Sequence, residues 1–349
     1  MWWVHRMFPQ GTVWHLRTVE AGRGRLRCPG MIDPRLQTLR VLHQRGTVTA
    51  TAEALHLTPS TVSQQLRQLS ARLGLELLEP AGRNVRLTPA ALALVEHADA
   101  LFARWEEARA DLAGYGDGVA GRLRITGVAT AIAGVIAPAV ARLREELPRL
   151  AVEIGEDPGE NRFELLLAGR ADIAVVIPAP GGPPPGSRRP DGELPPSDDA
   201  RFTQLPVLEE PQDLLVPDGH RFAGRVAQGV TLAEAAGESW IRAGDPADQH
   251  QLLLTACATA GFTPRVRHDA VDWYAVAALV AHGFGICLIP RLAPVPERCP
   301  VVRVPLRGEP LPVRRFLAAV RRGSERRPPV ARGLAALRAA AGEREAKGV

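Results

Sequence analysis

The chain has 349 residues, more than one hydrophobic core of about 150 residues usually serves, so a single small module is excluded. Hydrophobic residues make up 46% and charged residues 23%, and no apolar run approaches the roughly 20 residues that a membrane-spanning helix needs. The formal net charge of +5 permits a nucleic-acid partner without demonstrating one. We expect a folded cytoplasmic protein of two or three domains with no membrane partner.

The cysteines indicate no metal or cofactor site. Cys28, Cys257, Cys287 and Cys299 lie far apart and lack the spacing of metal ligands. Reduced cytosolic thiols are the simplest interpretation. A redox-sensing pair is the alternative, although the sequence shows neither a reactive thiolate nor two cysteines close together.

Residues 1–30 carry tryptophans and arginines but no apolar segment of signal-peptide length. The first helical pattern begins directly after Met31, so we expect Met31 to be the true start or residues 1–30 to be a disordered arm. A basic arm that contacts DNA is the alternative.

Three short helical patterns follow. The first begins at Asp33 and Pro34 and ends before Gly46, and the second lies between Thr47 and Leu57. Thr58 is expected to cap the third helix, with Pro59 at its first position. A buried stripe is expected on this third helix at Val62, Leu66, Leu69 and Leu73.

The outward face of the third helix carries hydroxyl, amide and guanidinium groups, from Ser60 to Gln68. Such groups suit a reader of the DNA major groove, although on an isolated helix a solvated polar face would be the simpler interpretation. The segment after this helix favours the DNA interpretation. It alternates from Leu77 to Leu87 around a glycine turn, which indicates a wing that presents Arg83 and Arg86 to phosphate or to the minor groove.

The run TAEALHLTPSTVSQQLRQLSARLGLELLEPAGRNVRLTPAA resembles the winged helix-turn-helix of LysR-type transcriptional regulators. This resemblance covers residues 31–90 in one register. It implies DNA contacts from Thr58, Pro59, Ser60, Ser63, Gln64 and Arg67, and from Arg83 and Arg86 of the wing. The chain departs from the family pattern at Asn84, where a basic residue is common, and at residues 79–81, where Phe-x-Arg is common. Both departures predict weaker wing contacts.

A long linker helix is expected over residues 88–115. Apolar residues from Leu87 to Leu112 recur at alternating spacings of four and three, which is typical of a coiled-coil seam. Core packing within one subunit is the alternative to a dimer contact. Pairing is favoured because two half-site readers bind DNA better than one, and the resemblance implies the same linker-helix dimer. The dimerisation residues expected on this seam are Leu94, Leu101, Trp105 and Leu112.

Strand and helix patterns alternate over residues 121–325, which predicts an α/β domain with two halves and a parallel sheet. Residues 178–200 are rich in proline, glycine and charge, and we expect a disordered loop there; a proline-rich ligand for a partner is the alternative. In the C-terminal segment 326–349, a last helix is expected from Pro329 to Gly342, with a frayed end from Glu343.

This second domain resembles the LysR-type effector-binding domain in its segments GRLRITG, LLLAGRADIAVV, ESWIRAG and WYAVAALVAHGFGICLIP. The resemblance implies two Rossmann-like lobes, as in periplasmic binding proteins, with a small ligand in the cleft between them. It places the two crossing strands near Val175 and near residues 205–207.

Three residues are candidates for effector binding. Thr130 starts a helix after the first strand, where its hydroxyl and nearby N–H groups could bind an anion; a helix cap is the alternative. Arg242 suits a carboxylate, and Phe284 lies in a turn that the resemblance places at the cleft. The simpler interpretations are a solvated arginine and a core phenylalanine.

No motif of a nucleophile, a metal site or a phosphate-binding loop is present, so the sequence predicts no enzyme, no catalytic residue and no cofactor. A solute-binding protein is the alternative function, but such a protein would normally carry an export signal and lack the DNA-binding segment. We therefore expect a LysR-type regulator whose partners are double-stranded promoter DNA, a small-molecule effector for which an anion is one candidate, further copies of itself as a dimer or tetramer, and RNA polymerase.

Overall fold

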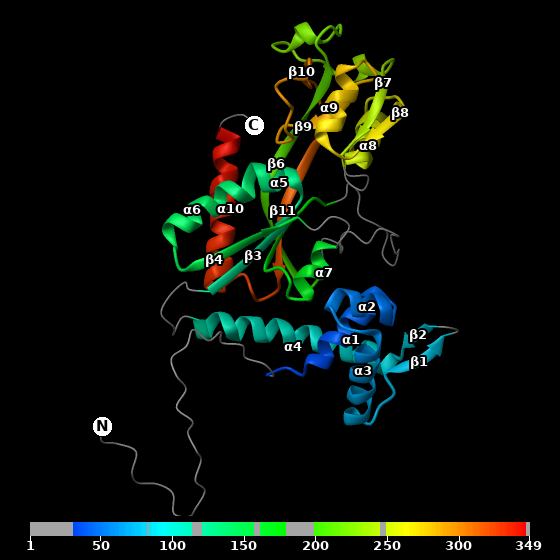
Figure 1. The fold of residues 1–349 in the computed structure, drawn as a ribbon, viewed down its shortest axis with the longest axis vertical. Coiled ribbons are helices and arrows are strands. Elements are labelled where there is room, and N and C mark those ends of the chain that lie inside the picture. The colour runs from blue at the N-terminus through cyan, green and yellow to red at the C-terminus, as the bar shows by residue number, and fades with distance from the viewer. Residues whose placement is uncertain are drawn as a thin grey trace, which may run out of the picture.

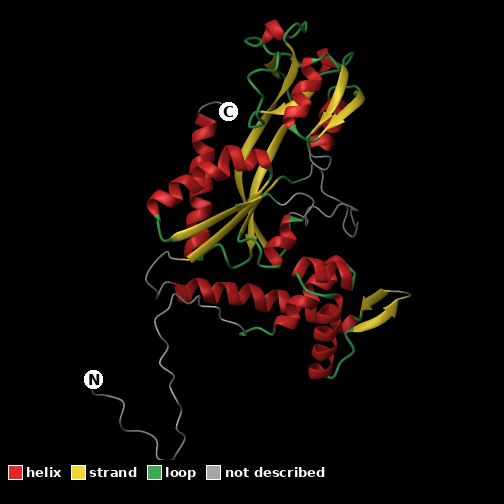
Figure 2. Ribbon diagram, in the orientation of Figure 1, coloured by secondary structure: helices red, strands yellow, loops and turns green. Residues whose placement is uncertain are grey.

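The computed structural model describes residues 31–81, 84–113, 121–156, 161–178, 199–244 and 249–346. The predictions for residues 1–30, for Arg83 and for most of the loop 178–200 lie outside the described residues. A small head, a long helix and a two-lobed domain follow one another along the chain (Figure 1). Helices cover the sheet of the two-lobed domain, whereas the head is mainly helical (Figure 2).

The head consists of α1 (Pro34–Arg45), α2 (Val48–Leu55), α3 (Pro59–Leu73) and a wing formed by β1 (Leu78–Ala81) and β2 (Asn84–Leu87). Local signals determine its helix ends. The Asp33 carboxylate accepts the Arg35 N–H at 3.0 Å, and Gly46 ends α1 with a φ of 72°. The predicted stripe on α3 is buried at Val62, Leu66 and Leu69. Its last member is wrong, because Leu73 is 45% exposed at the end of the helix.

Helix α4 (Pro89–Ala113) is the predicted linker helix, and its two halves pack against different parts of the chain. Its first turns complete the head core, where Ala91 and Val95 are buried and Leu94 packs against them. Its second half runs beside the lobe of the next domain that contains β3 and β4 (Figure 1). The N-terminal part of the predicted seam thus serves packing within the chain.

Lobe I contains β3 (Gly121–Gly127), β4 (Leu150–Gly155) and β5 (Ile173–Val176), which pair in parallel in the order β5-β3-β4. One face of this sheet is covered by the continuous helical segment α5 (Ala129–Ala131), η1 (Ile132–Ile136) and α6 (Ala137–Glu146), together with α10 (Pro328–Ala346). Helix α7 (Arg162–Leu167) covers the other face. Lobe I is therefore a three-layered α/β unit.

Two long strands connect the lobes. Strand β6 (Phe202–Pro217) pairs with β11 (Val313–Arg321) over residues 202–211 and then, beyond Pro211, with β9 (Cys287–Pro290) and β10 (Val301–Pro305). Both crossing strands run antiparallel to their neighbours, so the sheet is mixed rather than parallel throughout. The remaining elements of lobe II are η2 (Ala223–Arg225), η3 (Leu232–Ala235), β7 (Ser239–Ala243), α8 (Gln249–Thr259), β8 (Arg265–Ala270) and α9 (Trp273–Ala281).

One expected crossing strand is wrong. Residues 205–207 do lie in the crossing strand β6, but Val175 lies within β5 inside lobe I, and the second crossing strand is β11. A strand pattern gives no information about the partner, and β11 comes far later in the chain. The predicted fraying from Glu343 is also wrong, because α10 continues to Ala346.

Candidate functional site

The first turn of α3 presents short polar side chains to solvent. The Thr58 hydroxyl caps the helix, accepting the Thr61 N–H at 3.2 Å, and it also lies 2.8 Å from the Ser60 hydroxyl. Pro59 occupies the first helical position as predicted. Thr58, Pro59 and Ser60 are all exposed, so the beginning of this helix is open to a partner.

The exposed face continues for two more turns. Gln64 and Arg67 are exposed and Ser63 is half-buried, whereas Val62 and Leu66 point into the head core. Behind this face, Thr38 of α1 and Gln65 share a hydrogen bond of 2.5 Å that ties α3 to α1. The N-cap and the first turns of α3 therefore leave five of the six expected residues exposed, and the sixth, Ser63, half-buried.

The wing forms as an antiparallel pair in which Arg86 lies opposite Glu79. The Arg86 guanidinium is exposed but makes an ion pair of 2.7 Å with the Glu79 carboxylate. Strand register, which the sequence does not state, brings these two side chains together. An approaching phosphate would have to compete with Glu79 for Arg86.

The four residues expected on the dimer seam are placed differently from one another. Leu94 packs against the head core of its own chain, and Trp105 is half-buried. Leu101 and Leu112 are 53% and 61% exposed on the second half of α4. Exposed leucines of this size on one helix are available to a second copy.

Buried polar groups meet where β6 and β11 pass between the lobes. Glu210 of β6 accepts two hydrogen bonds from Arg314 of β11, at 2.7 and 3.0 Å, and one from the Leu292 N–H at 2.5 Å. The Thr130 hydroxyl lies 2.9 Å from Nη2 of Arg314, which donates to it. Helix α5 begins after Val128, so Thr130 does not cap it. Its hydroxyl belongs to this interlobe cluster.

The other two effector candidates lie in lobe II. Arg242 of β7 pairs with Asp269 of β8 at 3.3 Å, and burial together with the Arg242 charge lowers the pKa of His250. Phe284 is 48% exposed, and its ring packs edge-on against the ring of His268, with 5.2 Å between the ring centroids. Their contacts are thus separate from those of Thr130.

Sequence reasoning missed two buried glutamines at the junction between the lobes. Gln249 donates to Gln212 at 2.8 Å, and both side chains are buried. Among the described residues, the amide nitrogen of Gln212 is buried without a hydrogen-bond partner. Leaving a buried donor unpaired costs roughly 1–3 kcal/mol. An unpaired donor is therefore more typical of a binding site than of a core. The polar run Glu209 to Asp213, interrupted only by Pro211, was the available signal.

Two thiols lie in the core of lobe II. Burial raises the pKa of both Cys257 and Cys287 to about 12. No group of three or more His, Cys, Asp or Glu side chains in the described part of the chain is placed to hold a metal ion. Across the same ranges, none of the helices combines the length and the apolar character that crossing a bilayer requires.

Comparisons with known proteins agree with this arrangement. Residues 34–92 match the bacterial regulatory helix-turn-helix proteins of the lysR family, and residues 116–342 match the LysR substrate binding domain. A probable hydrogen peroxide-inducible genes activator of Mycobacterium avium is 28% identical over 259 residues, which are 74% of this chain and 77% of that protein. The DNA-binding transcriptional dual regulator OxyR of Escherichia coli K12 is 25% identical over 263 residues, 75% and 80% of the two chains.

The fold is similar to that of full-length OxyR from Pseudomonas aeruginosa, with a TM-score of 0.58 at 19% identity over 88% of this chain and 98% of that one. The match of the head to a DNA-binding family does not favour the solute-binding alternative, and the matched families consist of regulators rather than enzymes. The chain therefore belongs to the LysR family, as a DNA-binding transcriptional regulator with an effector-binding domain.

Proposed function

We propose that this regulator acts in the cytoplasm as a dimer or tetramer, binds partly symmetric promoter DNA, and changes its hold on that DNA when a small anionic effector binds. Contact with RNA polymerase at the promoter is part of this proposal. The observation that carries it is the exposed polar face of α3, which rests on a buried apolar stripe.

Base contacts are proposed for Gln64 and Arg67, because Gln can pair with adenine and Arg with guanine in the major groove. Thr58, Pro59, Ser60 and Ser63 approach the backbone at the start of α3, where N–H groups favour phosphate. Arg86, together with Arg83, contacts phosphate from the wing.

Dimerisation is proposed for the second half of α4, through Leu101, Trp105 and Leu112. The exposure of both leucines supports this proposal. Leu94 is half-buried against the head core of its own chain, so its contact with a partner is secondary to that packing. Two heads held by one pair of helices can read two half-sites.

The effector is proposed to bind at the junction between the lobes. Gln212 offers a buried N–H donor there, and Thr130, Arg242 and Phe284 are the residues carried over from sequence. An effector that binds one arrangement of the lobes more tightly shifts the population of that arrangement, and α4 carries the shift to the heads.

Footprinting of DNA from upstream of its own gene tests the DNA contacts. We expect a protected, partly symmetric site that Arg67→Ala weakens by about 1–3 kcal/mol. The control Arg338→Ala changes an exposed arginine on α10 and should leave the footprint intact. An equal loss in both variants would show that only overall charge matters.

A peroxide response, which the names of the relatives suggest, is a second candidate with less support. Thiolates react with peroxide and thiols hardly do. With pKa values of about 12, Cys257 and Cys287 are protonated at neutral pH. These two buried thiols thus give no support to an oxidant as the signal.

A further inference from the structure

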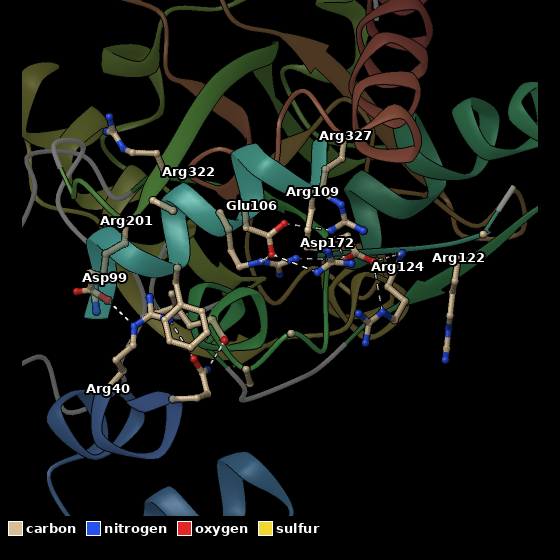
Figure 3. A pocket seen from close by; sticks show the side chains of 18 residues that line it. Arg40, Asp99, Glu106, Arg109, Arg122, Arg124, Asp172, Arg201, Arg322 and Arg327 are labelled. Atoms are coloured by element: carbon tan, nitrogen blue, oxygen red, sulfur yellow. Dashed lines mark hydrogen bonds and ion pairs between the residues drawn. The ribbon is translucent and has the colours of Figure 1, made fainter. Parts of the chain in front are cut away.

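A cavity of about 1070 Å³ lies between the head, α4 and lobe I, away from the junction between the lobes (Figure 3). Its walls come from α1, from the middle of α4, from the start of β3, from the turn after α7 and from the turn between β11 and α10. Its volume is slightly above the range of about 300–1,000 Å³ found for small-molecule sites. The head, α4 and lobe I therefore all contribute residues to this cavity.

The lining of this cavity is strongly basic. Three carboxylates line it, namely Asp99, Glu106 and Asp172. Eight guanidinium groups line it, namely Arg40, Arg109, Arg122, Arg124, Arg201, Arg321, Arg322 and Arg327. Asp199 and Glu153 pair with Arg201 and Arg122 from outside the lining. Among the described residues, cations therefore outnumber the anions that face or pair with them.

The lining carboxylates are already shared among several arginines. Glu106 of α4 is buried, and it pairs with Arg321 at 3.3 Å and with Arg327 at 3.4 Å. Asp172 pairs with Arg321 at 3.3 Å and with Arg124 at 3.4 Å. Figure 3 shows Glu106, Asp172, Arg124 and Arg327 lying close to one another at the cavity wall. Each of these two carboxylates thus neutralises part of the charge of at least two arginines, and neither neutralises one arginine completely.

Two arginines at the cavity are available to a ligand. Arg109 is exposed and reaches Glu106 only at 3.7 Å. The exposed guanidinium of Arg322 points away from Glu106 and Asp172 (Figure 3), and it makes no ion pair with the residues that the structure describes. Guanidinium groups bind phosphate and carboxylate with two parallel N–H donors, so the Arg322 group and the loosely paired Arg109 group favour an oxyanion.

Repulsion within the lining points the same way. Burial lowers the pKa of Arg40, and the charges of Arg201 and Arg321 lower it further against the opposing effect of Asp99. Burial also lowers the pKa of Arg327, where the charges of Arg109 and Arg321 act against those of Glu106 and Asp172. A bound anion would relieve this repulsion between cations.

We propose that this cavity binds a small oxyanion with two or more negative charges, a phosphate or a polycarboxylate, and that the bound ion holds the head, α4 and lobe I in one arrangement. The proposal does not depend on the effector site between the lobes. Its structural basis includes two direct contacts between the head and lobe I, from Gln37 to the Leu167 carbonyl and from Arg45 to Glu164. A ligand that bridges the same parts stabilises these contacts too.

Isothermal titration of the full chain with pyrophosphate, and separately with citrate, tests the proposal at an ionic strength held constant with sodium chloride. We expect one ion of at least one of these kinds to bind per chain. The variant R109Q/R322Q should weaken binding about tenfold or more, as expected for loss of charge-assisted hydrogen bonds. The matched variant R338Q, on exposed α10, should bind like the unchanged chain.

A second variant separates this site from the DNA face. R67Q should keep the affinity for the ion while losing affinity for DNA, so failure of the DNA proposal and failure of the cavity proposal give different results. Hydrogen exchange should slow in residues 99–109 and 162–172 when the ion is added. Binding no tighter than that of chloride, binding unchanged in R109Q/R322Q, or binding lost in R67Q would each overturn the proposal.

Discussion

Nη2 of Arg314 lies 2.7 Å from Oε2 of Glu210 where the two crossing strands pass between the lobes. Both side chains are almost fully buried, at 5% and 0% exposed. A buried ion pair is expensive to desolvate, but removal of one partner costs more because the other charge is then left alone. This ion pair therefore holds β6 against β11 at the junction between the two lobes.

Arg314→Met should lower the free energy of unfolding by about 3–5 kcal/mol, because the Glu210 charge stays buried without its partner. The double variant Glu210→Leu/Arg314→Met removes both charges and should recover most of this loss. Urea denaturation of the full chain measures both. Equal losses in the single and the double variant would show that packing, and not the unpaired charge, determines the effect.

The ion pair between Glu79 and Arg86 predicts opposite effects from its two members. Arg86→Ala should weaken DNA binding at all sequences and lower the slope of log affinity against log salt by about one. Glu79→Gln releases Arg86 and should strengthen binding to any DNA. Anisotropy titrations at several salt concentrations measure the slopes; a slope unchanged by Arg86→Ala would remove the wing from the interface.

Leu101→Asp/Leu112→Asp should disrupt the dimer, because association would bury unpaired charge between two α4 helices. The control is Leu311→Asp, a similarly exposed leucine in lobe II that should leave the dimer intact. Sedimentation velocity distinguishes the species. A dimer that survives both changes on α4 would place the interface elsewhere.

Cys257 and Cys287 should be unreactive in the folded protein. With a pKa of about 12, both thiols stay protonated at pH 8. The unfolded chain loses these two thiol protons near pH 8.5, whereas the folded chain still binds them. The free energy of unfolding should therefore fall as the pH rises from about 9 to 12. Titration with a disulfide reagent, with and without denaturant, checks the first point; rapid reaction of both thiols in the folded state would contradict the burial argument.

Local signals in the sequence predicted the head well. Thr58 and Pro59 act within one helical turn, and Gly46 ends a helix by its own conformation, so no distant residue is needed to interpret them. The seam on α4 was harder, because an apolar repeat does not say whether the head core or a second copy covers it. Leu94 turned out to face the core.

The site between the lobes could not be predicted in the same way. Glu210 and Arg314 are 104 positions apart and meet only because β6 and β11 pair in one register. The cavity below lobe I likewise needs α1, α4 and the end of β11 in one place. Such groups depend on tertiary contacts, and single-sequence patterns do not specify those.

Anisotropy binding of the full chain to DNA from upstream of its own gene, with a shuffled DNA of equal length as reference and at two salt concentrations, tests the central claim most directly. We predict tighter binding to the native DNA at both concentrations, with the preference lost in Arg67→Ala. Equal affinity for both DNAs, or no binding even at low salt, would contradict a sequence-specific role for α3.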